Sequence, residues 1–288
     1  MATFGVTIFP TDYAISPMNL ATAVEARGLD SLFFNEHTHI PTSRKSPFPG
    51  GGELPKHYCH TYDPFVAFGA AAAVTQRIRL GTGICLVVER DPIQLAKEVA
   101  SLDTLSHGRV ILGIGGGWNA EEMEDHGTPF PQRWKVLRER VLAMREIWTK
   151  DTAEFHGEFV NFGPLWSWPK PVQEGGPKIL LGSKAKKGLG RVVEYCDGWM
   201  PLGGPGMEMQ LAEGIKELRT LCEGAGRRFE SLELAVIGLG PEKETAQRLL
   251  ESGFTHLIFT LPPAGADSVL PLLDDYAKLA KQLGSKNV

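Results

Sequence analysis

A glutamate and a histidine stand side by side at the end of a predicted strand. The apolar run Leu32–Phe34 predicts the strand, and Glu36 and His37 follow it. Histidine titrates near neutral pH and a carboxylate can hold or release a proton, so this pair could act as acid and base beside a bound ring. The alternative is that both are loop residues whose side chains are satisfied by hydrogen bonds. Glu36 and His37 are therefore the candidate catalytic residues.

A second candidate site is the glycine run that follows a short apolar strand. The strand leads into Gly115, Gly116 and Gly117, and Trp118 comes next. Glycines at a strand end leave main-chain N–H groups uncovered, so an anion or a flat ring can approach the backbone closely. The spacing differs from the dinucleotide-binding fingerprint, because Trp118 occupies the position of its last glycine. The run predicts either a cofactor-binding shelf or a glycine-rich turn without a ligand.

Two further strand ends carry glycine. Gly83 and Ile84 follow one predicted strand, and Gly182 and Ser183 follow another. A helix is expected soon after Ser183, and a helix N-terminus offers unpaired N–H donors and partial positive charge to an anion. The lysines in this stretch are Lys184, Lys186 and Lys187. The alternative is a solvated helix start whose lysines do nothing specific.

A metal centre is not predicted. His37 and His39 form an H-x-H pair, but a metal site needs further ligands from other strand ends. The strand ends expected at Ser183, Pro201 and Leu261 supply none. The cysteines are widely spaced and form no C-x-x-C pair, so neither a zinc knuckle nor a disulfide framework is expected. This cysteine usage fits a reducing cytoplasm, where we expect the protein.

Composition narrows the class of partner. The 288 residues are 42% hydrophobic and 22% charged, with a net charge of -4, which is ordinary for a soluble globular protein with a sizeable core. This charge gives no reason to expect nucleic acid or an anionic membrane as partner. The apolar runs are too short to span a bilayer, and the first residues lack the regions of a signal peptide. A small-molecule substrate is the expected partner.

Strands and helices alternate along the chain. The predicted strands cover residues 4–9, 30–34, 78–83, 109–114, 178–183, 197–200, 232–237 and 256–260. Because helices separate them, the strands must pair in parallel through right-handed crossovers. Eight such units in a chain of this length favour a closed (β/α)8 TIM barrel, an α/β fold, over an open sheet. We expect one domain over residues 1–288, with catalytic residues at the carboxyl ends of the strands.

Two segments depart from this alternation. Residues 41–60 form a proline- and glycine-rich stretch that is long for a connection in a compact domain, which predicts a lid or binding loop. Residues 151–175 contain a short hairpin insertion, followed by Trp166 and Trp168. A pocket lined by these tryptophans and Trp118 would suit an apolar or ring-shaped substrate.

Several motifs, in this order, resemble those of the luciferase-like monooxygenase superfamily. They are Phe34-Asn35-Glu36-His37, Ile40-Pro41-Thr42, Arg79-Leu80-Gly81-Thr82-Gly83-Ile84, Leu105-Ser106-His107-Gly108-Arg109, the run from Gly113 to Trp118, Phe155-His156-Gly157, Pro169-Lys170-Pro171-Val172-Gln173 and Asp197-Gly198-Trp199. The resemblance covers residues 4–201. Within the superfamily it points to the branch that uses the deazaflavin coenzyme F420 rather than FMN.

The resemblance implies a barrel of the bacterial-luciferase type, with the coenzyme lying across the strand ends, and a homodimer. It places a non-proline cis peptide bond between Gly83 and Ile84, behind the ring. It assigns the ribityl chain and phosphate to residues 115–117, and the phosphate also to Gly182 and Ser183.

The activity that the resemblance implies is hydride transfer between C5 of the deazaflavin and a small organic substrate. Glu36 and His37 would be the nearest protonic groups. Some F420 enzymes carry a proton-donating glutamate where this chain has Trp118, which puts that acid in doubt and suggests an aromatic wall of the substrate pocket. The alternatives are an FMN-dependent monooxygenase of the same superfamily and a non-catalytic protein that stores or shields a flavin or deazaflavin.

Overall fold

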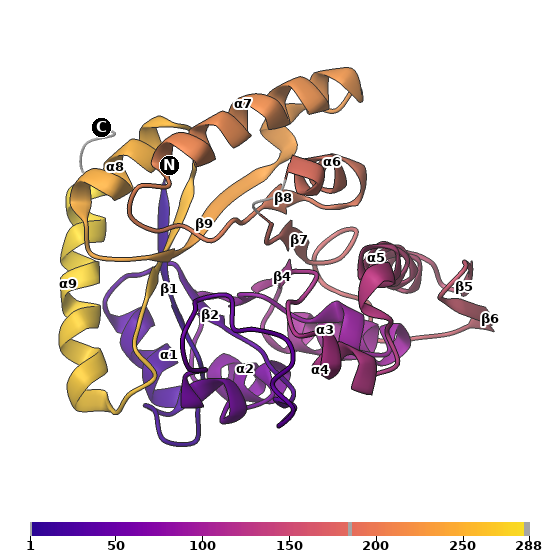
Figure 1. Cartoon of the computed structure of the whole chain (residues 1–288), viewed down its shortest axis with the longest axis horizontal. Coiled ribbons are helices and arrows are strands. Elements are labelled where there is room, and N and C mark those ends of the chain that lie inside the picture. The colour runs from indigo at the N-terminus through magenta and orange to yellow at the C-terminus, as the bar shows by residue number, and fades with distance from the viewer. Residues whose placement is uncertain (1, 184–185, 285–288) are drawn as a thin grey trace.

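Within residues 2–183 and 186–284, which the computed structural model describes, eight parallel strands close into a barrel (Figure 1). The barrel strands are β1 (Thr3–Ile8), β2 (Ser31–Phe34), β3 (Arg79–Thr82), β4 (Val110–Ile114), β7 (Lys178–Leu181), β8 (Gly198–Trp199), β9 (Glu233–Leu239) and β10 (His256–Thr260). They pair in chain order, and β10 closes the barrel against β1. The predicted α/β barrel is confirmed.

Helices alternate with the barrel strands and lie outside them (Figure 1). They are α1 (Pro17–Ala26), α2 (Pro64–Ala73), α3 (Pro92–Leu105), α4 (Ala120–Asp125), α5 (Arg133–Thr149), α6 (Lys186–Tyr195), α7 (Glu208–Gly224), α8 (Lys243–Glu251) and α9 (Ala266–Gly284). At the starts of α2 and α3, the side chains of Asp63 and Asp91 accept main-chain N–H groups, and a proline follows each aspartate. Proline lacks the N–H that a first turn leaves unpaired, so each Asp-Pro pair determines where its helix begins.

Apolar side chains fill the barrel interior. They are Phe33, Ile111, Leu180, Met200, Ala235, Ile237 and Ile258. The interior is therefore a packed core, and a ligand must bind at the end of the barrel rather than along its axis. None of the described helices combines the length and the apolar character needed to cross a membrane.

The predicted hairpin insertion is present as β5 (Ala153–His156) and β6 (Asn161–Leu165), an antiparallel pair between α5 and β7. The carboxylate of Glu139 on α5 accepts the main-chain N–H groups of residues 158–160, which ties the hairpin turn to the helix. The hairpin lies beside α5, to one side of the barrel (Figure 1).

Candidate active site

A cavity of about 630 Å³ lies at the carboxyl ends of the barrel strands. Because parallel strands all end on the same side of a barrel, residues that are distant in sequence converge there. Eight of the residues selected from the sequence line this cavity. They are Glu36, His37, Gly83, Ile84, Gly117, Trp118, Gly182 and Ser183. Their roles toward a ligand stay predictions.

The glycine run contributes less to the cavity than expected. Among the described residues that line the cavity, Gly117 is the only one of the three, and its φ of 67° favours glycine. A Cβ on Gly116 would lie 2.7 Å from the ring of Trp134, and one on Gly115 would lie 2.8 Å from the side chain of Ile84. The Cβ positions of these two glycines face side chains of the protein itself, and their part in binding a coenzyme stays a prediction.

The long loop between β2 and α2 supplies aromatic rings to the cavity wall. Its lining residues include Phe48 and Tyr58, the latter from a short 3-10 helix, η1 (Lys56–Cys59). The Tyr58 ring centroid lies 5.0 Å from that of His37 and 6.3 Å from that of Trp118. Burial raises the pKa of the Tyr58 phenol above its usual value, so it stays protonated. This loop is therefore part of the site, as the binding-loop prediction required.

Trp166 and Trp168 do not belong to this wall. They follow the hairpin and are 81% and 57% exposed, and neither is among the described residues that line the cavity. The expectation that they form the substrate pocket with Trp118 is wrong, because the insertion carries them to the side of the barrel.

Asn35 holds the end of β3 in place, a role that the sequence did not reveal. The peptide bond between Gly83 and Ile84 is cis, as the resemblance implied. The Asn35 amide donates a hydrogen bond of 2.7 Å to the carbonyl oxygen of Gly83 and accepts one of 2.9 Å from the hydroxyl of Thr7. The ends of three adjacent strands are thus joined at the cavity.

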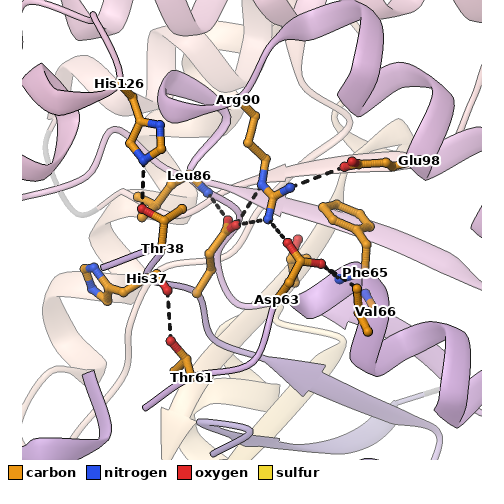
Figure 2. Close-up of polar contacts among 12 residues, drawn as sticks. His37, Thr38, Thr61, Asp63, Phe65, Val66, Leu86, Arg90, Glu98 and His126 are labelled. Carbon is orange, nitrogen blue, oxygen red and sulfur yellow. Dashed lines mark hydrogen bonds and ion pairs between the residues drawn. The ribbon is translucent and has the colours of Figure 1, made fainter. Parts of the chain in front are cut away.

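Glu36 is buried in an ion pair. Its carboxylate accepts Nε of Arg90 at 2.7 Å and the main-chain N–H of Leu86 at 2.6 Å, and its side chain is 1% exposed. Figure 2 shows the Arg90 guanidinium reaching Asp63 and Glu98 as well. A carboxylate engaged on both oxygens is poorly placed to exchange protons with a ligand. The ion pair argues against an acid or base role for Glu36, and its catalytic role stays a prediction.

His37 has a defined partner on each ring nitrogen. Its Nδ1 lies 2.7 Å from Oε2 of Glu122, which comes from α4, and its Nε2 accepts the indole N–H of Trp118 at 3.3 Å. The main-chain carbonyl of His37 accepts the hydroxyl of Thr61 (Figure 2). Indole nitrogen can only donate, so Nε2 is the unprotonated nitrogen and Nδ1 carries the hydrogen. The residue predicted to move protons therefore has its basic nitrogen at the cavity wall, where its lone pair accepts the N–H of Trp118.

Two buried carboxyl groups lie behind His37. Glu122 is fully buried, and Glu89, at the end of the 3-10 helix η2 (Val87–Glu89), is buried close enough to feel its charge. Burial, followed by the negative charges of Glu122 and Glu36, raises the pKa of Glu89 to about 9. Glu89 is therefore a neutral acid at neutral pH.

The strand end at Gly182 and Ser183 faces the same cavity. The carbonyl oxygen of Ser183 accepts the indole N–H of Trp199 at 2.7 Å, and α6 begins at Lys186. Lys184 lies outside the described residues, and Lys187 is exposed. The anion site remains a prediction that rests on the helix start. Within the described residues, no cluster of His, Cys, Asp or Glu side chains is arranged to hold a metal ion.

Comparison with known proteins shows the family. Residues 15–265 match the family described as luciferase-like monooxygenase. An uncharacterized protein of Mycobacterium tuberculosis is 40% identical over 282 residues, covering 96% of this chain and 98% of that protein. An F420-dependent glucose-6-phosphate dehydrogenase of Amycolatopsis mediterranei is 28% identical over 224 residues, covering 75% of this chain and 62% of that protein.

Solved structures share the barrel. An F420-dependent secondary alcohol dehydrogenase, in complex with an F420-acetone adduct, superposes with a TM-score of 0.79 at 17% identity, covering 98% of this chain and 99% of that chain. The monooxygenase RslO1 from Streptomyces bottropensis superposes with a TM-score of 0.75 at 20% identity, covering 99% of this chain and 100% of that chain. At such identities the likeness shows the fold alone. The family match and the relative that is similar over nearly its whole length establish that this chain belongs to the luciferase-like monooxygenase family and is an oxidoreductase.

Proposed function

We propose that this oxidoreductase uses coenzyme F420 and moves a hydride between the deazaflavin and a small, uncharged organic substrate. The observation that carries the proposal is the unprotonated Nε2 of His37 at the wall of a cavity of about 630 Å³. Support for the coenzyme comes from the 28% identical dehydrogenase and from the alcohol dehydrogenase of like fold, both named as F420-dependent.

The chemistry of the cavity fits a deazaflavin ring. Gly83, Gly117 and Gly182 line it, and rings line it at Tyr58 and Trp118. A flat conjugated ring stacks on aromatic faces, and backbone N–H groups can bind its carbonyl oxygens. The volume also falls within the roughly 300–1,000 Å³ that small-molecule sites occupy.

His37 handles the proton that accompanies hydride transfer. When bound, the deazaflavin supplies a hydride acceptor or donor at its C5. With an alcohol as substrate, Nε2 of His37 would exchange the N–H of Trp118 for the substrate hydroxyl and accept its proton, while the hydride would pass to the deazaflavin and a carbonyl would remain. In the reverse direction the imidazolium returns that proton to the carbonyl oxygen. A positioned acid or base of this kind contributes ~10²–10⁴ in rate.

The cavity favours an uncharged substrate. No lysine or arginine is among its described lining residues, and the one carboxylate there, Glu36, is neutralised by Arg90. Away from the helix start after Ser183, where the phosphate of the coenzyme is expected, a phosphate or sulfonate on the substrate would lose its hydration without gaining a charged partner, which is costly. An apolar alcohol, aldehyde or ketone meets no such penalty among the aromatic rings.

An FMN-dependent monooxygenase is the second candidate. The observation that favours it is the likeness in fold to RslO1, which is named as a monooxygenase. The two candidates differ in coenzyme and in their need for oxygen, so a single assay series separates them.

The assay incubates the purified chain with F420 and a panel of neutral alcohols, including cyclohexanol and propan-2-ol, and follows loss of the deazaflavin absorbance. Glucose 6-phosphate is the charged comparison, and reduced FMN with oxygen and cyclohexanone tests the second candidate. We expect F420 reduction by a neutral alcohol and none by glucose 6-phosphate. Turnover only with reduced FMN and oxygen would overturn the proposal.

A further inference from the structure

The contact between His37 and Glu122 controls which nitrogen of the imidazole is basic. The two side chains are 7% and 0% exposed, so water does not compete for their hydrogen bond of 2.7 Å. Neutral imidazole has two tautomers, and the partner of one nitrogen determines which is present. A carboxylate can only accept a hydrogen bond, so Nδ1 must carry the hydrogen. Nε2 is left without one, and its lone pair accepts the indole N–H of Trp118 at the cavity wall.

Glu122 is itself held by a second contact. Its Oε1 accepts the main-chain N–H of Thr38 at 3.0 Å, the residue directly after His37. The carboxylate therefore bridges the ring and the backbone of the same short segment. Both oxygens are engaged, so neither the position of the carboxylate nor the plane of the imidazole is free to change.

A second buried carboxyl group, Glu89, lies close to Glu122. No donor among the described residues reaches Oε2 of Glu89, which is buried. Burial and the negative charges of Glu122 and Glu36 raise the pKa of Glu89, so Glu89 holds a proton near neutral pH. Glu122 accepts hydrogen bonds from the segment of His37 and Thr38.

We propose that Glu122 is the positioning residue that locks His37 in the tautomer with a basic Nε2 facing the cavity, and that it stabilises the imidazolium formed when His37 takes up a proton. The inference rests on the proposed function for its catalytic consequence. Its structural content, the tautomer, is independent of any coenzyme. A buried carboxylate of this kind both orients a histidine and offsets its developing positive charge.

The first test measures the tautomer in the unaltered protein. Nitrogen NMR of the histidine side chains, in isotope-labelled full-length chain near neutral pH, distinguishes a ring nitrogen that carries hydrogen from one that does not. The His37→Gln variant assigns the His37 signals by their loss. We expect the hydrogen on Nδ1 and none on Nε2. A hydrogen on Nε2 would overturn the proposal whatever the enzyme's substrate.

The second test removes the charge at constant size. Glu122→Gln can present an amide N–H to Nδ1, so it no longer selects one tautomer. We expect kcat with F420 to fall ~10²-fold or more, by analogy with loss of the carboxylate that orients the histidine in Ser-His-Asp enzymes. The F420 Kd should stay within about threefold. Glu122→Asp retains a carboxylate and should recover part of the loss. Glu124→Gln, exposed on the same helix, is the matched control and should keep wild-type turnover.

The outcomes separate the two proposals. Normal turnover in Glu122→Gln, with F420 activity present in the wild type, would overturn the positioning role and leave the proposed function standing. If the wild type shows no F420 activity, the proposed function fails, and the NMR measurement alone decides whether Glu122 sets the tautomer of His37.

Discussion

The side-chain amide of Asn35 donates a hydrogen bond of 2.7 Å to the carbonyl oxygen of Gly83, 48 residues further along the chain. Its own oxygen accepts the hydroxyl of Thr7 at 2.9 Å. One side chain thereby connects the ends of β1, β2 and β3 at the cavity. This wall of the site is held by the protein alone and needs no ligand to form it.

Asn35→Ala should weaken coenzyme binding. The variant removes both hydrogen bonds, each with a net value of about 0.5–1.5 kcal/mol, and leaves the Gly83 carbonyl without its partner. We expect the F420 Kd to rise about tenfold and the melting temperature to fall by a few degrees, measured by titration and calorimetry. Asn19→Ala, exposed on α1, is the control. A folded Asn35→Ala variant with unchanged affinity would show that this contact does not shape the site.

Glu36→Gln should lower the free energy of unfolding more than it changes turnover. Arg90 retains Asp63 and Glu98 as partners, so the expected loss in free energy of unfolding is about 1–3 kcal/mol, measured by urea denaturation. The shape of the pH–rate profile should not change. Glu98→Gln, whose side chain is 27% exposed, should cost less. Loss of one limb of the profile in Glu36→Gln would return an acid/base role to Glu36.

His37→Gln should remove proton transfer and leave binding intact. Glutamine forms hydrogen bonds but cannot accept and release a proton near neutral pH, so turnover should fall by roughly two orders of magnitude or more. The F420 Kd should stay within a few-fold. Steady-state kinetics and a coenzyme titration on the same preparation make the comparison. Near-normal turnover would reduce His37 to a structural residue.

Acid should destabilise the barrel through Glu233, which begins β9. Burial alone would raise its pKa, but hydrogen bonds from His256 and Arg79 lower it to about 2. The native chain therefore binds a proton at this site less readily than the unfolded chain, whose carboxyl has the ordinary value of 4.5. The stabilisation is present above that value and is lost as the pH falls toward 2.

Glu233→Gln should be less stable than the wild type at neutral pH and lose less stability on acidification. Urea denaturation at a series of pH values measures both effects. Glu230→Gln is the control, since that side chain is 65% exposed. If the stability of Glu233→Gln fell with pH as steeply as that of the wild type, Glu233 would not be the group that makes the barrel sensitive to acid.

The barrel could be predicted because its signals are local. Apolar strands alternate with helices, and Asp63-Pro64 and Asp91-Pro92 mark two helix starts directly. The carboxyl ends of parallel strands share one side, so residues such as His37 and Ser183 could be placed together before any contact was known. The hairpin was predicted for the same reason, as a break in the alternation.

The partners of the site residues could not be predicted in this way. Glu122 lies 85 residues from His37, and from the sequence alone it is only one of several acidic residues in a short helix. Arg90 is 54 residues from Glu36, so their ion pair could not be predicted from spacing. Spacing also cannot distinguish a glycine that faces a ligand from Gly116, which faces Trp134. These contacts depend on how distant elements pack.

The choice of F420 over FMN is tested most directly by titrating one preparation of the wild-type chain with each coenzyme, at low and at added salt. F420 carries an anionic glutamate tail beyond its phosphate, whereas FMN ends at the phosphate. The loop between β2 and α2 carries Arg44, Lys45 and Lys56, whose attraction to the tail would be screened by salt. We predict that F420 binds more tightly than FMN and loses more affinity when salt is added. Equal or tighter binding of FMN would contradict F420 dependence.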